Sequence, residues 1–183
     1  MEHFSDESIM EKNLSRERVF DGIIMHIDHL TNRLPNGKAA KREVAMHVGA
    51  SAVLPVDADG SVYLVRQFRA PIDQVLLEIP AGKLDHADED RLLAAKRELR
   101  EETGLEAEKW LRLTDTFTTP GFSNERISLY LAQKLFHGES SPDEDEFLNV
   151  VKLPFEEALA MVMRGEIRDA KTQIALCMAQ NLI

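Results

Sequence analysis

The chain has 183 residues, of which 44% are hydrophobic and 30% charged, with a formal net charge of −10 and a single cysteine, Cys177. This length favours one globular domain, the lone cysteine excludes an intrachain disulfide, and no apolar run approaches the roughly 20 residues of a membrane span. The polar, acidic start MEHFSDESIM lacks the pattern of a secretory signal and so negative a surface repels phosphate backbones, so we expect a cytoplasmic protein with neither membranes nor nucleic acids as partners.

The N-terminal quarter of the chain carries strand patterns after a featureless beginning. Residues 1–13 show no periodicity, and we predict a flexible N-terminus there. RERVFDGIIMHIDHL reads as a strand or a bent pair of strands, and LPNGKAAKREVAMHV adds a Pro-Asn-Gly turn and a further strand. We predict an antiparallel hairpin over residues 16–47, within a β arm at 14–47 that precedes the main domain at 48–183.

The main domain is expected to begin with strands. The stretch GASAVLPVDADGSVYLVRQF holds two apolar runs around residues 57–60, which is the clearest hairpin signal in the sequence. The next apolar stretch, VLLEIP, predicts a short strand that ends at Pro80.

A helix is predicted over residues 89–103. Asp88 suits the N-cap, and Gly104 suits the position that follows the last helical residue. At 100° per residue, three glutamates fall on one helix face, next to an apolar stripe: Glu98, Glu101 and Glu102.

The C-terminal part combines strands with two helices. LRLTDTFTT, RISLYLAQKL and FLNVVKL predict strands, and the polar stretch HGESSPDEDE predicts a loop before the last of them. Helices follow at about 154–164 and 169–181, and the second carries an apolar stripe through Ile174, Leu176, Cys177 and Leu182. We therefore expect Cys177 to be a buried small hydrophobe rather than a nucleophile. Together the elements predict an α+β fold with a mostly antiparallel or mixed sheet.

The three glutamates on one helix face have two interpretations. They form either a solvated acidic face, partly neutralised by nearby arginines, or a cation site. Because they border a buried stripe, their repulsion is costly there, and clustered carboxylates are the ligands that Mg²⁺ and Mn²⁺ prefer. The glycine-containing passage EIPAGKL precedes the helix and can turn the backbone carbonyl of Ala81 inward as another oxygen ligand. These points favour the cation site.

The segment that contains these acids resembles the Nudix box, whose pattern is Gly-x5-Glu-x7-Arg-Glu-U-x-Glu-Glu-x-Gly-U, where U is aliphatic. The sequence GKLDHADEDRLLAAKRELREETGL matches the second half of the box completely, from Arg97 to Leu105. In the first half, six residues rather than five separate Gly82 from Glu89, which a one-residue insertion in the loop explains. We assign Glu89 a structural role, either holding the loop or pairing with Arg97.

The resemblance implies a Nudix α/β/α sandwich with a mixed sheet, and a hydrolase that cleaves a nucleoside diphosphate linked to another group. It implies that Glu98, Glu101 and Glu102 bind Mg²⁺ or Mn²⁺, with the carbonyl of Ala81 as a further ligand. The cations would neutralise the diphosphate oxygens and position an attacking water. In this interpretation Glu101 also counts as a catalytic residue.

Similarity to the ADP-ribose pyrophosphatase group of this family extends over about residues 14–180. It is carried by LPNGKAAKREVAMHVGASAVLPV, LVRQFRAPIDQVLLEIPAGKL and TPGFSNERISLYLA, and by Pro120, sixteen positions after Gly104, where the group has a marker proline. The resemblance implies metal-dependent hydrolysis of ADP-ribose, a small nucleotide-sugar, to AMP and ribose 5-phosphate. It also implies a homodimer in which the N-terminal strands cross to the partner and complete its site.

Four residues receive substrate roles from their positions in these segments. Arg69 of RQFRAP would contact the phosphates, and Arg42 of KREV would lie near the phosphates or the ribose. Glu43, next along the strand, is a weaker candidate for ribose or base contacts. Glu78 would support the metal loop or form a structural salt bridge.

The polar stretch PDEDEF matches a loop in which this group places an acid that orients or deprotonates the attacking water. We assign this role first to Glu146 and second to Glu144. A solvated acidic loop would have the same composition.

Two alternative functions stay open. One is hydrolysis of another nucleotide-sugar or dinucleotide, such as GDP-mannose, NADH or a diadenosine polyphosphate. The other is a non-catalytic sensor that binds ADP-ribose, which the intact acids of the box disfavour. Identifying the released nucleotide would separate these possibilities.

Overall fold

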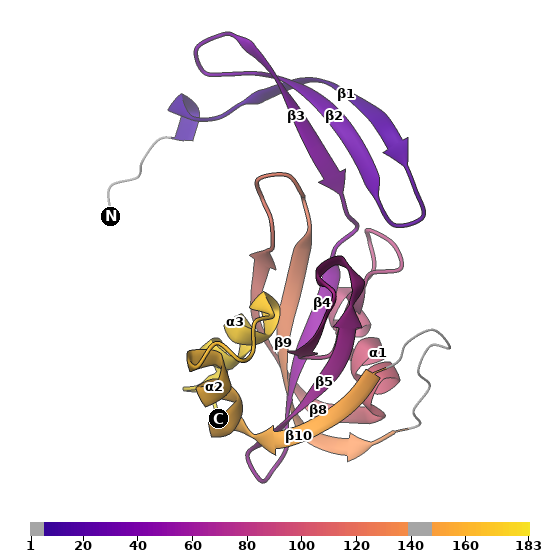
Figure 1. Cartoon of the computed structure of the whole chain (residues 1–183), viewed down its shortest axis with the longest axis vertical. Helices are drawn as coiled ribbons and strands as arrows, with labels where there is room; N and C mark the ends of the chain where they lie inside the picture. Colours follow the sequence, from indigo (N-terminus) through magenta and orange to yellow (C-terminus); the bar gives the residue numbers. More distant parts are fainter. Residues whose placement is uncertain (1–5, 139–147) are drawn as a thin grey trace. The chain divides into compact units, whose positions relative to one another are not determined.

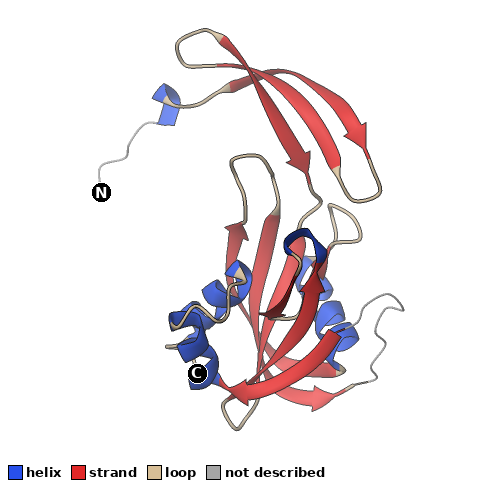
Figure 2. Cartoon of the chain, in the orientation of Figure 1, coloured by secondary structure: helices blue, strands red, loops and turns tan. Residues whose placement is uncertain are grey.

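The computed structural model describes residues 6–138 and 148–183 (Figures 1 and 2). The described residues form two compact units. The first contains the residues up to His47 together with Phe117–Glu125, and the second contains Val48–Thr116 and Arg126–Ile183.

The first unit is a three-stranded antiparallel sheet in the order β1-β2-β3. A short 3-10 helix (Asp6–Ser8) precedes β1 (Lys12–Asp21), β2 (His26–Arg33) and β3 (Ala39–Met46). The sheet replaces the single hairpin predicted over 16–47: a turn closed by a hydrogen bond from Gly22 N to Met25 O (2.9 Å) makes RERVFDGIIMHIDHL the bent pair of strands. The Pro-Asn-Gly turn is confirmed, with Gly37 at φ +83° between β2 and β3.

A distant segment, Phe117–Glu125, extends this first unit. Ala45 N donates a hydrogen bond to Phe122 O (2.7 Å), and His47 N donates one to the Asn124 side-chain oxygen (2.7 Å). The TPGFSNE stretch therefore packs on β3, which the division of the sequence by residue ranges did not anticipate.

Apolar side chains of the first unit are unusually exposed. Ile23, at the turn between β1 and β2, is 97% exposed. The same strand and turn expose further apolar side chains: Leu14, Val19, Phe20, Ile24 and Met25. Several exposed apolar side chains on one strand and its turn are typical of an interaction surface.

The second unit is built on a seven-stranded mixed sheet. Its main path runs β10-β5-β4-β9-β8, with β6 paired to β5 and β7 paired to β4. Strands β4 and β9 run parallel, whereas β5 is antiparallel to β4, β6 and β10. The strands are β4 (Ala50–Val56), β5 (Ser61–Arg69), β6 (Gln74–Glu78), β7 (Ala81–Lys83), β8 (Leu105–Phe117), β9 (Arg126–His137) and β10 (Leu148–Pro154), with a short 3-10 helix (Ala70–Ile72) after β5.

Helices cover both faces of this sheet (Figure 1). Successive residues of the fully buried strand β4 point to opposite faces. Val53 belongs to a core cluster with Leu99 of α1 (Arg91–Thr103), whereas Leu54 belongs to a larger cluster with Leu176 of α3 (Ala170–Ala179). That larger cluster also contains Phe155 at the start of α2 (Phe155–Met163). The α/β/α sandwich with a mixed sheet and an antiparallel N-terminal sheet is thus confirmed.

Two details of the predicted helices are wrong. Helix α1 is capped by Asp90 rather than Asp88, because the Asp90 carboxylate accepts hydrogen bonds from Leu92 N and Leu93 N (both 2.9 Å). Cys177 is exposed rather than buried. The buried face of α3 runs instead through Lys171, Thr172, Ala175, Leu176 and Ala179. In the described part of the chain, no helix has the length and apolar character to cross a membrane.

Candidate active site

The acids of α1 lie against a short strand that follows β6. Glu98 and Glu102 are only 7% and 5% exposed, whereas Glu101 is more accessible. The backbone N–H of Ala81, the first residue of β7, donates to the Glu102 carboxylate (3.2 Å). The structure therefore brings Ala81 and the acid-bearing helix face together through the Ala81 N–H, whereas the sequence prediction concerned its carbonyl as a metal ligand.

Gly82 allows this close approach. A Cβ at position 82 would lie well under 3.0 Å from all three atoms of the Glu98 carboxyl group, closer than real Cβ atoms approach such neighbours. Glycine at position 82 leaves space for that carboxylate against β7, and any larger residue would force the carboxylate or the strand to move. The additional residue in the first half of the box thus does not displace Gly82 from the acids.

Arg97 provides positive charge to the acids. One of its guanidinium nitrogens donates to Glu98 (2.6 Å) and lies 3.3 Å from Glu101, and the other lies 3.4 Å from Glu89. Burial lowers the pKa of Arg97, but the surrounding carboxylates, Glu98 foremost, raise it above its ordinary value. Glu89 also accepts a hydrogen bond from Asp85 N (2.7 Å), so both structural contacts expected of Glu89 are present.

The donor set has the chemistry of a site for a hard divalent cation. Three carboxylates and a backbone segment offer only oxygen ligands, which Mg²⁺ and Mn²⁺ prefer, and glycine at position 82 leaves the Glu98 carboxylate uncrowded. Within the described residues, no three acidic, histidine or cysteine side chains converge as a formed metal centre. Arg97 lies between Glu98 and Glu101 instead, so a cation would share or replace its contacts.

A second charged group lies one strand away. Glu78, at the end of β6, is 1% exposed and receives two hydrogen bonds of 2.7 Å from the Arg69 guanidinium. Lys171 Nζ contacts the same carboxylate. Burial alone raises the pKa of Glu78, but Arg69 and Lys171 outweigh it and hold that pKa below its ordinary value. Of the two roles predicted for Glu78, the salt bridge is present.

Electrostatics connects the two groups. Hydrogen bonding to Glu78 raises the pKa of Arg69, and the charge of Glu102 contributes to the same upward shift. The Arg69 guanidinium therefore lies within electrostatic reach of the acids on α1. The structure thus combines an acidic helix face with an arginine that retains 39% exposure of its side chain.

The comparisons with known proteins identify the family. A family model described as the NUDIX domain matches residues 45–173. The chain belongs to the Nudix family. Nudix hydrolases generally depend on a divalent metal ion.

Two relatives align with nearly the whole of this chain. A protein named ADP-ribose pyrophosphatase from Bacillus subtilis (strain 168) is 41% identical over 172 residues, covering 93% of this chain and 92% of that protein. A protein named methanol dehydrogenase activator from Bacillus methanolicus is 39% identical over 168 residues, covering 91% and 90%. A crystal structure described as an ADP compounds hydrolase has a TM-score of 0.81 at 22% identity, covering 94% and 93% of the two chains, and supports the fold.

The other residues with predicted roles lie elsewhere. In the N-terminal unit, Arg42 forms an ion pair with Glu11, and Glu43 lies 3.7 Å from His29. Glu144 and Glu146 fall outside the described residues.

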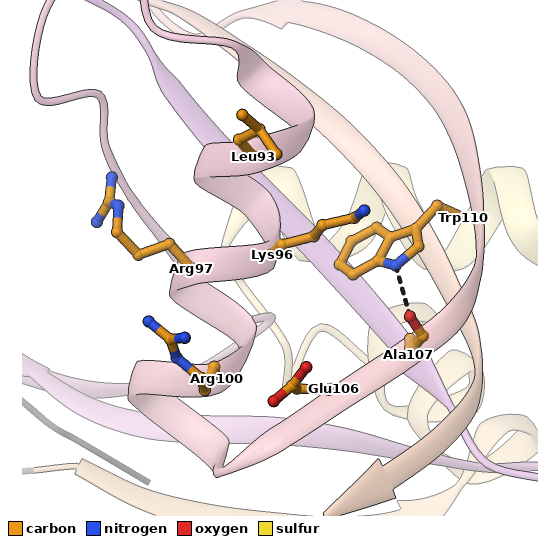
Figure 3. Close-up of a pocket in the computed structure, with 7 residues that line it drawn as sticks. All are labelled: Leu93, Lys96, Arg97, Arg100, Glu106, Ala107 and Trp110. Carbon is orange, nitrogen blue, oxygen red and sulfur yellow. Dashed lines mark hydrogen bonds between the residues drawn. The ribbon is translucent and has the colours of Figure 1, made fainter. Parts of the chain in front are cut away.

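A pocket of about 300 Å³ lies beside α1 and is lined by Lys96, Arg97, Arg100 and Trp110, among others (Figure 3). Lys96 and Arg100 fall about 160° around the helix from Glu98. The Lys96 ammonium lies 5.8 Å from the centre of the Trp110 ring, and Trp110 Nε1 donates to Ala107 O (3.0 Å). Figure 3 shows Arg97 directed away from Trp110. Arg97 both lines this pocket and contacts Glu98 and Glu101, so the pocket adjoins the acidic helix face through that residue.

Sequence reasoning missed the part that α3 has in this site. In the first turn of α3, Lys171 contacts Glu78 at the end of β6 and Thr172 accepts a hydrogen bond from Ile79, while Asp169, the N-cap of the helix, contacts Lys171. One signal was available: a lysine in the first turn of a helix opposes the helix dipole, which indicates that a carboxylate compensates it.

Proposed function

We propose that this chain hydrolyses the pyrophosphate bond of ADP-ribose, giving AMP and ribose 5-phosphate, in a metal-dependent reaction. The proposal depends above all on one observation: Glu98 and Glu102 are buried against the backbone of Ala81 and Gly82. The 41% identity to a protein named ADP-ribose pyrophosphatase supports this substrate.

The acidic helix face is the proposed metal site. Glu98, Glu101 and Glu102, with the carbonyl of Ala81, would hold Mg²⁺ or Mn²⁺. When bound, such ions neutralise the diphosphate oxygens and lower the pKa of water. Arg97 holds the carboxylates in place and offsets their repulsion.

The substrate is proposed to be held by the chain's own cations. Arg69 would bind the diphosphate, with Glu78 fixing the orientation of its guanidinium through two hydrogen bonds. Arg42 and Glu43 are proposed to contact the phosphates, ribose or base. An acid, Glu146 in the first instance and Glu144 or Glu101 otherwise, would orient or deprotonate the attacking water.

We also propose a homodimer in which the first unit contacts a second copy. The exposed apolar side chains of β1 and its turn support this assignment. Sedimentation at micromolar concentration should show a dimer, and Ile23→Asp should shift it toward the monomer. A monomeric wild type would contradict the proposal.

Product analysis with a substrate panel tests the function directly. ADP-ribose, GDP-mannose, NADH and a diadenosine polyphosphate are incubated with the chain in Mg²⁺ or Mn²⁺, and the products are identified by mass. Equimolar AMP and ribose 5-phosphate are expected from ADP-ribose, with none in excess chelator. Preferential release of GMP from GDP-mannose would reassign the substrate, and saturable binding of ADP-ribose without AMP release would indicate a sensor.

The relative named methanol dehydrogenase activator suggests a second candidate function, stimulation of a methanol dehydrogenase. Addition of the chain to such an enzyme distinguishes the two functions. Stimulation by wild type but not by Glu102→Gln would tie this function to the hydrolytic site, and equal stimulation by both would make it independent of that site.

A further inference from the structure

The first turn of α3 contains buried polar residues that the proposed function does not use. Lys171 is 8% exposed and Thr172 is fully buried. Burial of an ammonium group is costly, and its position at the positive end of a helix dipole adds to that cost. A lysine at such a position therefore needs a carboxylate partner.

Lys171 has two such partners. Its ammonium group contacts Glu78 and lies 2.9 Å from Asp169, the N-cap of α3. Glu78 in turn receives two hydrogen bonds from Arg69. Four charged groups thus alternate in sign from the exposed arginine to the cap of the helix.

The same helical turn also holds the backbone beyond Glu78. Ile79 N donates to the Thr172 hydroxyl oxygen (2.8 Å), and Thr172 N donates to Asp169 (2.9 Å). Ile79 is followed by Pro80 and then by Ala81, whose N–H contacts Glu102. The start of α3 therefore fixes both the carboxylate of Glu78 and the chain that leads to the acids of α1.

We propose that Lys171 is a positioning residue for substrate binding, acting through Glu78 on Arg69. The proposal rests on the role of Arg69 in the proposed function. Lys171 binds one oxygen of Glu78 and so fixes the orientation of the carboxylate that accepts the two hydrogen bonds of the Arg69 guanidinium. The exposed end of Arg69 is then oriented before the substrate arrives, which reduces the entropy lost on binding.

Lys171 also changes the charge that a phosphate meets. Arg69, Glu78, Lys171 and Asp169 together carry two positive and two negative charges, so the group is neutral as a whole. Removal of Lys171 leaves one positive and two negative charges, a net charge of −1 that repels a phosphate. The effect on an anionic ligand should therefore appear in binding rather than in the chemical step.

Lys171→Met tests this inference, because methionine keeps an unbranched side chain, one atom shorter than lysine, and removes the charge. We expect KM for ADP-ribose to rise by about tenfold, as for loss of one charge-assisted hydrogen bond, with kcat within about twofold of wild type. The dissociation constant of ADP-ribose in excess chelator, measured by calorimetry, should rise by the same factor. Lys171→Arg, which keeps the cation, should recover most of the affinity.

Arg168→Met is the matched control. Arg168 is also a cation at the start of α3 and also contacts β6, through the side chain of Gln74 rather than Glu78. Its removal should leave KM unchanged. If Lys171→Met does not fold, Lys171→Gln keeps a hydrogen-bond donor without the charge and should raise KM by a smaller factor, about threefold.

Three results would overturn the inference: an unchanged KM in folded Lys171→Met or Lys171→Gln, an equal rise in Arg168→Met, or no recovery in folded Lys171→Arg. The proposed function has a separate criterion, AMP release by the wild type. An active wild type with a KM equal to that of folded Lys171→Met would refute the positioning role alone, whereas an inactive wild type would refute both.

Discussion

Gly82→Ala is expected to remove most turnover from a chain that still folds. The new Cβ would lie well under 3.0 Å from the Glu98 carboxyl atoms, whereas ordinary contact begins at 3.4 Å. Either the carboxylate or β7 must then move by roughly 1 Å to restore ordinary contact. A displacement of this size at a catalytic group reduces turnover by about 10²-fold, and overpacking of this kind destabilises by about 1–3 kcal/mol.

The assay for Gly82→Ala combines AMP release from ADP-ribose with thermal unfolding. Gly121→Ala is the control, since a Cβ there meets nothing within 4 Å, and it should match wild type in both measurements. Adding Glu98→Asp to Gly82→Ala withdraws the carboxylate from the new methyl group and should recover stability without recovering turnover. Wild-type turnover in Gly82→Ala would refute the reasoning that β7 must approach Glu98 closely.

Three further predictions concern the charged groups of the site. Glu102→Gln should lower kcat by about 10²-fold without lowering the unfolding temperature, because it relieves repulsion on α1; wild-type turnover would exclude a metal role. Arg69→Ala should raise KM for ADP-ribose by about tenfold or more, and an unchanged KM would exclude phosphate binding. The folded pKa of Glu78 lies below its ordinary value, so its ionised form stabilises the chain above about pH 4.3 and this contribution is lost as pH falls through the folded pKa. The difference in the free energy of unfolding between wild type and Glu78→Gln should therefore be largest near neutral pH and disappear in acid. A difference that does not change with pH would contradict the assignment.

The parts of the fold that could be predicted depend on local geometry. The angular spacing of residues along a helix places Glu98 and Glu102 on one face whatever the rest of the chain does. Composition does not select the N-cap, because Asp88 and Asp90, near the start of α1, are both residues of the type that caps helices. Asp90 is the cap because its carboxylate accepts hydrogen bonds from the amides of Leu92 and Leu93. Residue type alone does not show which of the two aspartates makes these bonds.

The parts that could not be predicted depend on contacts between distant residues. Lys171 and Thr172 are buried in α3 because they bond to Glu78 and Ile79, 93 residues earlier in each case. A prediction from hydropathy assigns polar residues to the exposed face. It therefore assigns Lys171 and Thr172 to the exposed face of α3 and Cys177 to the buried face, the reverse of what the structure shows. The same limit applies to position 82: glycine is required there because the Glu98 carboxylate of α1 lies against β7.

Arg97 explains how a chain can fold with three repelling carboxylates on one helix face. Buried carboxylates are stable when a counter-charge accompanies them, and Arg97 supplies that charge to Glu98 and Glu101. In the proposed metal site a divalent cation would take the same oxygens, so binding replaces one positive partner by another. The free energy of cation binding is then a difference between two favourable interactions, which favours an exchangeable ion over a permanently held one. Contacts of Arg97 with Glu89 and with the carbonyl of Lys83 (both 3.4 Å) would keep the guanidinium beside the acids during that exchange.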